Sequence, residues 1–163
     1  MKRFFSFLLC ILLAVHLCSC TESVNMSVLT AYQSGDFEAE LQIKSEGKER
    51  TCSLAKSGGR LFLRLHGLEG FTFVFDENGS GIISGGTEIP LASGAPLPLC
   101  ELSRLFSVSA TGTWKIEKAR PGGVSLYVCE GDGITLYIDA CSHLPLKITS
   151  AAMEANVLSF KAK

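Results

Sequence analysis

Apolar and polar side chains alternate along most of the chain from Asp36 onward. In the first such run the odd positions from Phe37 to Ile43 are apolar, and the positions between them are acidic or amide side chains. Successive side chains of a β-strand point to opposite faces, so a period of two predicts strands with one buried face and one solvated face. The pattern is typical of antiparallel sheets, and it requires another part of the chain to cover the apolar face.

Turn signals divide this region into about ten or eleven short strands, at the spacing of roughly 8–12 residues that all-β domains show. Residues 76–79, Asp-Glu-Asn-Gly, are a strong hairpin signal. Residues 131–133, Gly-Asp-Gly, are predicted to form a three-residue loop. Such a loop keeps Val128 opposite Leu136, with both side chains directed inward.

The period changes once, in the middle of the chain. Leu99, Leu102, Leu105 and Phe106 are spaced three or four residues apart, which predicts an apolar helix face that follows a proline-containing first turn. This face has to be buried against the apolar face of the sheet. The expected fold is therefore mainly β (α+β): a strongly curved antiparallel sheet, or half-barrel, of about 10–11 strands wrapped around one central helix, in a single domain over residues 36–163.

The N-terminal residues have the features of a secretory signal. Lys2 and Arg3 precede an apolar run that is too short for a comfortable membrane span and that ends in small residues. Residues 17–20, Leu-Cys-Ser-Cys, resemble the bacterial lipobox, whose last Cys is acylated. The resemblance implies a lipoprotein signal peptide over residues 1–19 and a lipid on Cys20, although Cys18 departs from the usual pattern and leaves the cleavage point open. The protein is then exported and lipid-anchored to the outer face of the bacterial membrane.

The segment that follows Cys20 has two interpretations. Val24, Val28, Leu29 and Tyr32 have a spacing near the helical period, and Gly35 closes the segment. Residues 20–35 therefore form either a short helix or a lipidated tether.

The charge balance excludes some partners. Without Lys2 and Arg3, the 15 Lys and Arg side chains become 13, against 16 Asp and Glu. A mildly acidic domain is not expected to bind nucleic acid, which requires a basic face. The same balance argues against an electrostatic hold on anionic lipid.

Four cysteines remain in the mature domain once Cys10 and Cys18 leave with the signal and Cys20 carries the lipid. They permit two disulfides in three possible pairings. Strand phasing predicts that two of them look inward and two lie on the polar side. The inward pair is Cys52 and Cys100, and the polar pair is Cys129 and Cys141. Because the chain has no CxxC pair and no Cys/His cluster, we expect no metal site and no cofactor.

The sequence contains no catalytic motif whose residues could form an active site, so we expect a protein that is not an enzyme. Ser53 and Lys56 match the S-x-x-K string of penicillin-recognising enzymes, and residues 56–58 resemble their K-T-G string. The two strings share Lys56, however, so they cannot be separate elements that converge on a pocket. His66 and His143 lie beside predicted turns without a ligand pattern, which is typical of surface side chains.

Two stretches resemble small uncharacterised lipoproteins of clostridial-type bacteria: residues 67–76 (GLEGFTFVFD), and residues 134–139 (ITLYID) with 144–148 (LPLKI). The order of elements is similar to the lipoprotein-carrier fold of LolA and LolB, in which a half-barrel shelters acyl chains. The resemblance implies a non-enzymatic protein that binds a lipid or a lipoprotein acyl group in an apolar concavity. The candidate lining residues are Phe71, Phe73, Phe75, Leu102, Leu105 and Phe106.

The same apolar rows also suit a closed core without a ligand. The alternative function is therefore a structural or interaction module of the cell envelope or the spore. A small hydrolase is a distant third possibility, because no nucleophile and base can be named. An open or a filled space between Phe73 and Leu105 separates the first two interpretations.

Overall fold

The computed structural model describes residues 24–77, 79–91 and 98–163, except for the side chains of residues 98–100. The predicted signal peptide (1–19) and Cys20 lie outside the described residues. The strands are β1 (Phe37–Ser45), β2 (Lys48–Ser57), β3 (Arg60–Leu65), β4 (Phe71–Asp76), β5 (Gly79–Ser84), β6 (Thr87–Pro90), β7 (Lys115–Ala119), β8 (Leu126–Gly131), β9 (Ile134–Asp139), β10 (Pro145–Ser150) and β11 (Glu154–Ala162). The helical elements are α2 (Met26–Leu29), η1 (Ala31–Gln33), α3 (Pro98–Leu105) and η2 (Pro121–Gly123).

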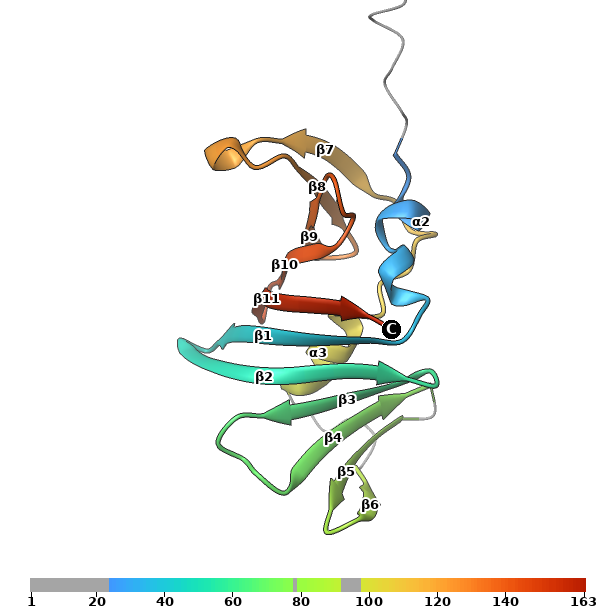
Figure 1. Cartoon of the computed structure of the whole chain (residues 1–163), viewed down its shortest axis with the longest axis vertical. Coiled ribbons are helices and arrows are strands. Elements are labelled where there is room, and N and C mark those ends of the chain that lie inside the picture. Colours follow the sequence, from blue (N-terminus) through green and yellow to red (C-terminus); the bar gives the residue numbers. More distant parts are fainter. Residues whose placement is uncertain (1–23, 78, 92–97) are drawn as a thin grey trace, which may run out of the picture.

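The strands form one antiparallel sheet in the order β6-β5-β4-β3-β2-β1-β11-β10-β9-β8-β7. Each neighbouring pair is consecutive in the chain except β1 and β11, which meet in the middle. The sheet therefore consists of two meanders, β1–β6 and β7–β11, joined along the β1–β11 pair (Figure 1). The expected antiparallel sheet of ten or eleven strands is confirmed.

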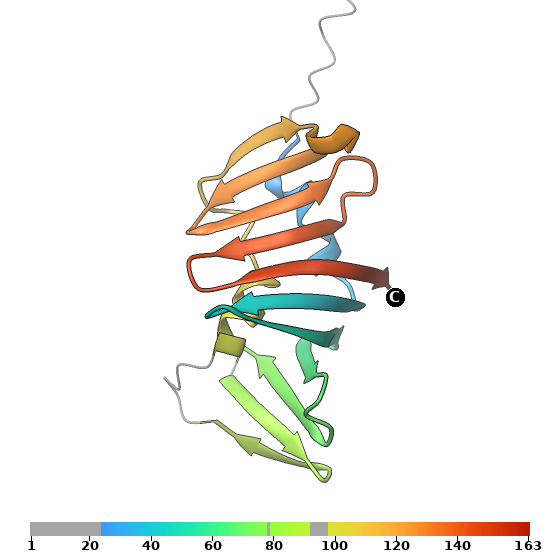
Figure 2. The ribbon, with the colours of Figure 1, turned by 90° about the vertical axis from the view of Figure 1, so that its left-hand side faces the viewer.

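The helix α3 connects the two meanders. Because β6 and β7 form opposite edges of the sheet, the connection between them has to cross a whole face. Figure 1 shows α3 behind β1 and β2, and Figure 2 shows both α2 and α3 on the far side of the strands. We call the side that carries these helices the helix face and the opposite side the open face.

The predicted half-barrel around a central helix is wrong in its curvature. The sheet twists along its length but is not strongly curled (Figures 1 and 2). With only eight residues, α3 is about 12 Å long at about 1.5 Å per residue. A helix of this length covers only a few strands, so it lies against part of one face, and the sheet has nothing long enough to wrap around.

The N-terminal segment covers another part of the helix face. Asn25 caps α2 by accepting a hydrogen bond from the Val28 N–H on its side-chain oxygen, at 3.1 Å. Met26 is 4% exposed and Leu29 is fully buried, and both belong to the main hydrophobic core. Tyr32 packs edge-on against Phe160 of β11, with ring centroids 5.6 Å apart. The described part of residues 20–35 thus forms short helices that belong to the domain core.

The predicted register between β8 and β9 is wrong by one residue. Gly131 pairs with Ile134, so the turn contains only Asp132 and Gly133, both with positive φ (50° and 73°). Two residues with positive φ are the mark of a tight hairpin turn that matches strand twist. A shift of one residue exchanges the two faces of a strand.

As a result of this shift, Leu136 lies opposite Cys129 instead of Val128. Cys129 is fully buried in the core on the helix face, so its predicted place on the polar side is also wrong. Val128 takes the open face in its place.

The same hairpin contains a close contact with Trp114, the single tryptophan of the chain. A Cβ atom at Gly131 would lie 2.7 Å from the indole ring of Trp114 and 2.8 Å from the carbonyl oxygen of Thr113. The ring of Trp114 therefore occupies the space that any side chain at position 131 would need.

We expect Gly131→Ala to lower the free energy of unfolding by about 1–3 kcal/mol, the usual cost of overpacking a closely packed site. Because Trp114 has to move, its fluorescence maximum should shift as well. Chemical denaturation followed by tryptophan fluorescence measures both effects. The matched control is Gly35→Ala, since a Cβ there meets nothing within 4 Å and φ is not positive. Equal stability of the two variants would contradict the contact.

Candidate functional site

The structure divides the six residues predicted to line an acyl cavity into two groups. Leu102, Leu105 and Phe106 of the α3 region are buried, and Phe75 joins them in one hydrophobic cluster with β1, β2 and β3. Phe73 is half-buried against this cluster. Phe71, at the start of β4, is 46% exposed. The helix residues and Phe75 thus belong to the core, whereas Phe71 lies at its margin.

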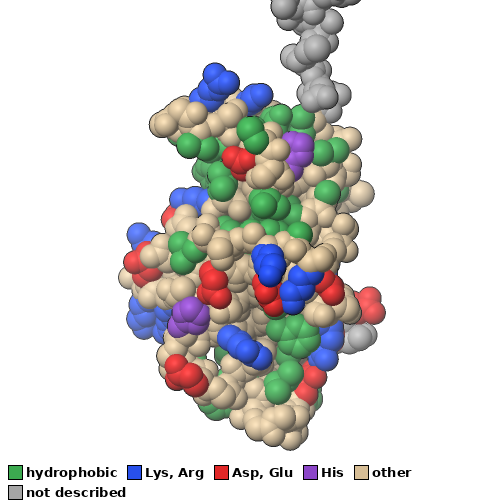
Figure 3. Space-filling model, viewed as in Figure 1, with side chains coloured by type: hydrophobic (Ala, Val, Ile, Leu, Met, Phe, Trp, Pro, Cys, Tyr) green, Lys and Arg blue, Asp and Glu red, His purple; other side chains and the backbone are tan. Residues whose placement is uncertain are grey.

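A hollow of about 450 Å³ lies beside Phe71, where β3 and β4 diverge. These two strands share only three paired positions, the last of them Leu63 with Phe73. β3 continues to pair with β2 as far as Leu65, and β4 pairs with β5 from Phe71. The sheet is therefore split at this end, and the space-filling view shows an opening beside the β3–β4 connection (Figure 3).

The connection between β3 and β4 passes this split, and two glycines with positive φ determine its backbone conformation. Gly67 and Gly70 have φ of 87° and 92°, a conformation that favours glycine, and they bracket Leu68 and Glu69. Leu68 is 44% exposed although its side chain is apolar. An apolar leucine within a turn is the signal in the sequence that points to the hollow, and side-chain alternation along the strands does not detect it.

The lining of the hollow combines apolar and polar groups. Leu65, Leu68, Phe71 and Ile83 supply the apolar part. Arg64 and Glu69 supply the charged groups, and Arg64 Nε donates a hydrogen bond to Thr72 Oγ1 across the split, at 3.2 Å. A second hollow of about 390 Å³ follows along the open face of β1–β3, shares Ser53 and Arg64 with the first, and is also lined by the carboxylates of Glu38 and Glu40. The arrangement suits an elongated molecule with one apolar and one anionic end.

Ser53, His66 and Glu40 meet on the open face but do not form a catalytic triad. Ser53 Oγ lies 3.1 Å from His66 Nε2, and Glu40 Oε2 lies 3.4 Å from the same nitrogen. A triad needs the acid on the other ring nitrogen, where it orients the base toward the nucleophile. All three side chains also face solvent, so the contact is best explained as part of the charged surface seen in Figure 3.

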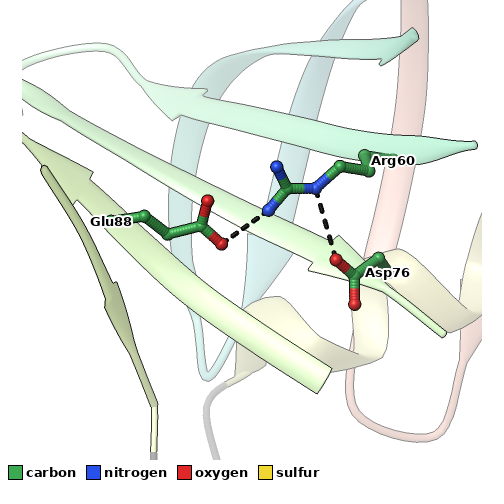
Figure 4. A network of polar contacts seen from close by, with 3 residues as sticks. All are labelled: Arg60, Asp76 and Glu88. Atoms are coloured by element: carbon green, nitrogen blue, oxygen red, sulfur yellow. Dashed lines mark hydrogen bonds and ion pairs between the residues drawn. The ribbon is translucent and has the colours of Figure 1, made fainter. Parts of the chain in front are cut away.

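An ion-pair network links β3, β4 and β6 at the end of β3 and β4 opposite the split. The Arg60 guanidinium on β3 binds Asp76 on β4 at 3.2 Å and Glu88 on β6 at 2.5 Å (Figure 4). Glu88 reaches Arg60 across Gly81, where a Cβ would lie 3.2 Å from the Glu88 carboxylate. The network ties the short edge strand β6 to β3, and its carboxylates are already engaged by Arg60.

No disulfide joins the cysteines of the described region. Cys52 and Cys129 are buried, Cys141 is exposed, and all three are free thiols, while the thiol of Cys100 lies outside the described atoms. Burial raises the pKa of Cys52 to about 12 and that of Cys129 to about 11. Burial likewise raises the pKa of Tyr32 to about 12. These groups are therefore held in their neutral forms and are poor nucleophiles.

The described residues contain no group of three or more His, Cys, Asp or Glu side chains that is arranged to hold a metal ion. Among them, no helix has the length and apolar character needed to cross a membrane.

Comparison with known proteins gives similarity of fold. No family model matches the sequence, and no curated protein matches it. An uncharacterised conserved protein from Thermus thermophilus is similar in structure, with a TM-score of 0.55 and 15% identity over 85% of each chain. At this identity the likeness concerns the fold alone.

Two further structures are more distant. A DUF1329 family protein from Desulfovibrio piger aligns with a TM-score of 0.47 and 8% identity, over 85% of this chain and 91% of the other. Pseudomonas aeruginosa MucB, in its complex with MucA, aligns with a TM-score of 0.43 and 20% identity over 82% of this chain. The chain spans about half the length of MucB, 54%.

We expect Cys141 to react with an alkylating reagent at pH 8 in the folded protein, whereas Cys52 and Cys129 react only when the protein unfolds. Burial and the raised pKa of the two core thiols both suppress thiolate formation. Peptide mapping by mass spectrometry assigns each label. Denatured protein, in which all three sites react, is the control. If Cys52 were labelled as fast as Cys141 under native conditions, its place in the core would be wrong.

Proposed function

We propose that this chain is an exported protein, anchored through an acylated Cys20, that binds an amphiphilic lipid or a lipoprotein acyl group without catalysing a reaction. The ligand lies in the hollow at the β3–β4 split, with its acyl chain against Leu68 and Phe71 and its anionic head group near Arg64. This assignment moves the site from the predicted space beneath α3 to the margin of the sheet.

The observation that carries this proposal is the mixed lining of the 450 Å³ hollow. Its volume lies within the range of roughly 300–1,000 Å³ that ligand sites occupy, and such sites combine apolar walls with a few placed polar groups. Phe71 and Leu68 expose large apolar side chains there, 46% and 44% respectively. A cation beside exposed apolar surface complements a ligand that is itself amphiphilic.

A second candidate function is an interaction module with a filled core. The burial of Leu102, Leu105 and Phe106, each at most 1% exposed, favours it, because these side chains are engaged in packing. In this alternative, the exposed residues around Phe71 contact a protein of the cell envelope instead of a lipid.

We expect an acyl-bearing molecule to co-purify with the protein from residue 21 onward, exported from bacteria and examined by native mass spectrometry with lipid extraction. Phe71→Asp should weaken its binding about tenfold or more, since it removes a large apolar contact and places a charge against the acyl chain. Leu158→Asp is the matched control, because Leu158 is 58% exposed on β11 and should leave binding unchanged.

The head group is tested by Arg64→Gln. This variant should lose affinity for anionic amphiphiles while it retains neutral ones of the same chain length. A native mass that shows no bound molecule on the unaltered protein would favour the interaction module. Equal binding by the Phe71 and Leu158 variants would favour it as well.

The anchor has its own test. We expect the full-length protein to partition into the detergent phase and to carry acyl chains on Cys20, and Cys20→Ser to abolish both, because stable anchoring needs at least two acyl chains. Phase separation followed by intact-mass measurement reports the two properties. Detergent-phase partitioning that survives in Cys20→Ser would exclude the lipid anchor.

A further inference from the structure

The described chain starts at one particular end of the sheet. The blue start of the ribbon lies at the β7 edge, in both Figure 1 and Figure 2. Val24 already packs against the hydrophobic core, so the folded body begins four positions after Cys20. Four residues span no more than about 14 Å when fully extended, at about 3.3–3.6 Å per residue. An anchor on Cys20 therefore holds the β7 end of the sheet close to the membrane, and this step rests on the proposed anchoring.

Exposed cations lie on the β7 edge, at this same end of the sheet. Lys118 and Arg120 are exposed, and neither forms an ion pair within the described part of the chain. Figure 3 shows Lys and Arg side chains at the top of the molecule, over the β7 end. Lys118 Nζ lies 5.8 Å from the Tyr127 ring centroid, which keeps the ammonium group at the strand without neutralising it. The net charge of −1 for the whole chain conceals this local excess.

Among the nearby acidic residues, those of β7 and β8 lie toward the other end of β7, whereas Asp139 of β9 lies two strands away at the corner end, where its carboxylate accepts hydrogen bonds from the Cys141 and Ser142 N–H groups and from the Ser142 hydroxyl. Glu117 is paired with Lys115 at 2.8 Å, and Glu130 lies opposite Lys115 in the register of β7 and β8. From Lys118 to Val128, the chain contains no acidic residue. The uncompensated charge is therefore confined to Lys118 and Arg120, at the end of β7 that leads into η2.

The loop that follows adds an apolar tip to this corner. Residues 121–123, Pro-Gly-Gly, form η2, and Val124 directly after them is 51% exposed. Cations flanking an exposed apolar side chain are the combination by which proteins settle into the head-group region of a bilayer. Each cation near an anionic lipid surface strengthens binding about fivefold.

We propose that Lys118, Arg120 and Val124, the β7 corner, rest on the anionic surface of the membrane that carries the anchor. The occupant is the head-group layer of anionic phospholipid. The corner therefore fixes the orientation of the sheet, which stands on its β7 edge instead of rotating freely about the anchor.

The test uses the full-length acylated protein in vesicles of brominated phosphatidylcholine, with or without phosphatidylglycerol. Tryptophan is placed at the corner by Val124→Trp, or far along the sheet by Leu158→Trp, and the signal of Trp114 in the parent is subtracted. We expect quenching at position 124 to exceed that at 158 severalfold, and to rise when phosphatidylglycerol is present.

The charge dependence provides a second measurement. Lys118→Glu with Arg120→Glu, in the Val124→Trp protein, should abolish the rise caused by phosphatidylglycerol. The control, Lys48→Glu with Arg50→Glu, changes the same number of exposed charges at the β1–β2 hairpin and should retain it. Equal quenching at positions 124 and 158 in protein whose intact mass includes the acyl chains would overturn the orientation and leave the anchor standing. An intact mass without acyl chains would overturn the anchor, and the orientation with it.

Discussion

The structure depends on the burial of one apolar face of the sheet. The width of this sheet is much greater than the length of any helix in the described chain. The spacings of about 4.8 Å between its eleven neighbouring strands add up to a width of about 48 Å, whereas α3 is about 12 Å long. The cover is therefore shared between α3, which lies behind β1 and β2 and contacts β10, and the short helices α2 and η1, where Tyr32 packs against Phe160 of β11. Phe71 of β4 lies beyond both and remains exposed. The candidate ligand site is thus a consequence of incomplete cover.

Much of this fold could be predicted from the sequence, because alternation of side chains reports directly on strands with one buried face. The helix over residues 98–105 could likewise be predicted from its spacing of three and four. Two features could not. The sequence from residue 131 to residue 133 is compatible both with a two-residue turn and with a three-residue loop. The register of β8 and β9, and with it the face on which Cys129 lies, could therefore not be predicted correctly. The split between β3 and β4 depends on where hydrogen bonding between strands stops. The matching rows from Leu61 to Leu65 and from Phe71 to Phe75 contain no sign of it.

In the proposed orientation, the ligand site and the membrane lie far apart. Seven strand spacings separate β3 from β7, which corresponds to about 34 Å at about 4.8 Å per strand. A ligand bound near Arg64 is therefore held clear of the bilayer surface, and the open face beside it is free for another molecule to approach. The Arg60 network keeps the outermost strands in place around that site without contributing to it.

The pairing of β1 with β11 also determines when the protein can fold. Its first and last strands lie side by side in the middle of the sheet, and Ser45 donates a hydrogen bond to the Ala152 carbonyl 107 residues away. Each meander can form from local hairpins, but contacts between such distant residues form slowly because a long loop must first close. The two halves therefore remain separate until β11 has emerged, and loss of β11 would divide the sheet at its centre instead of trimming an edge.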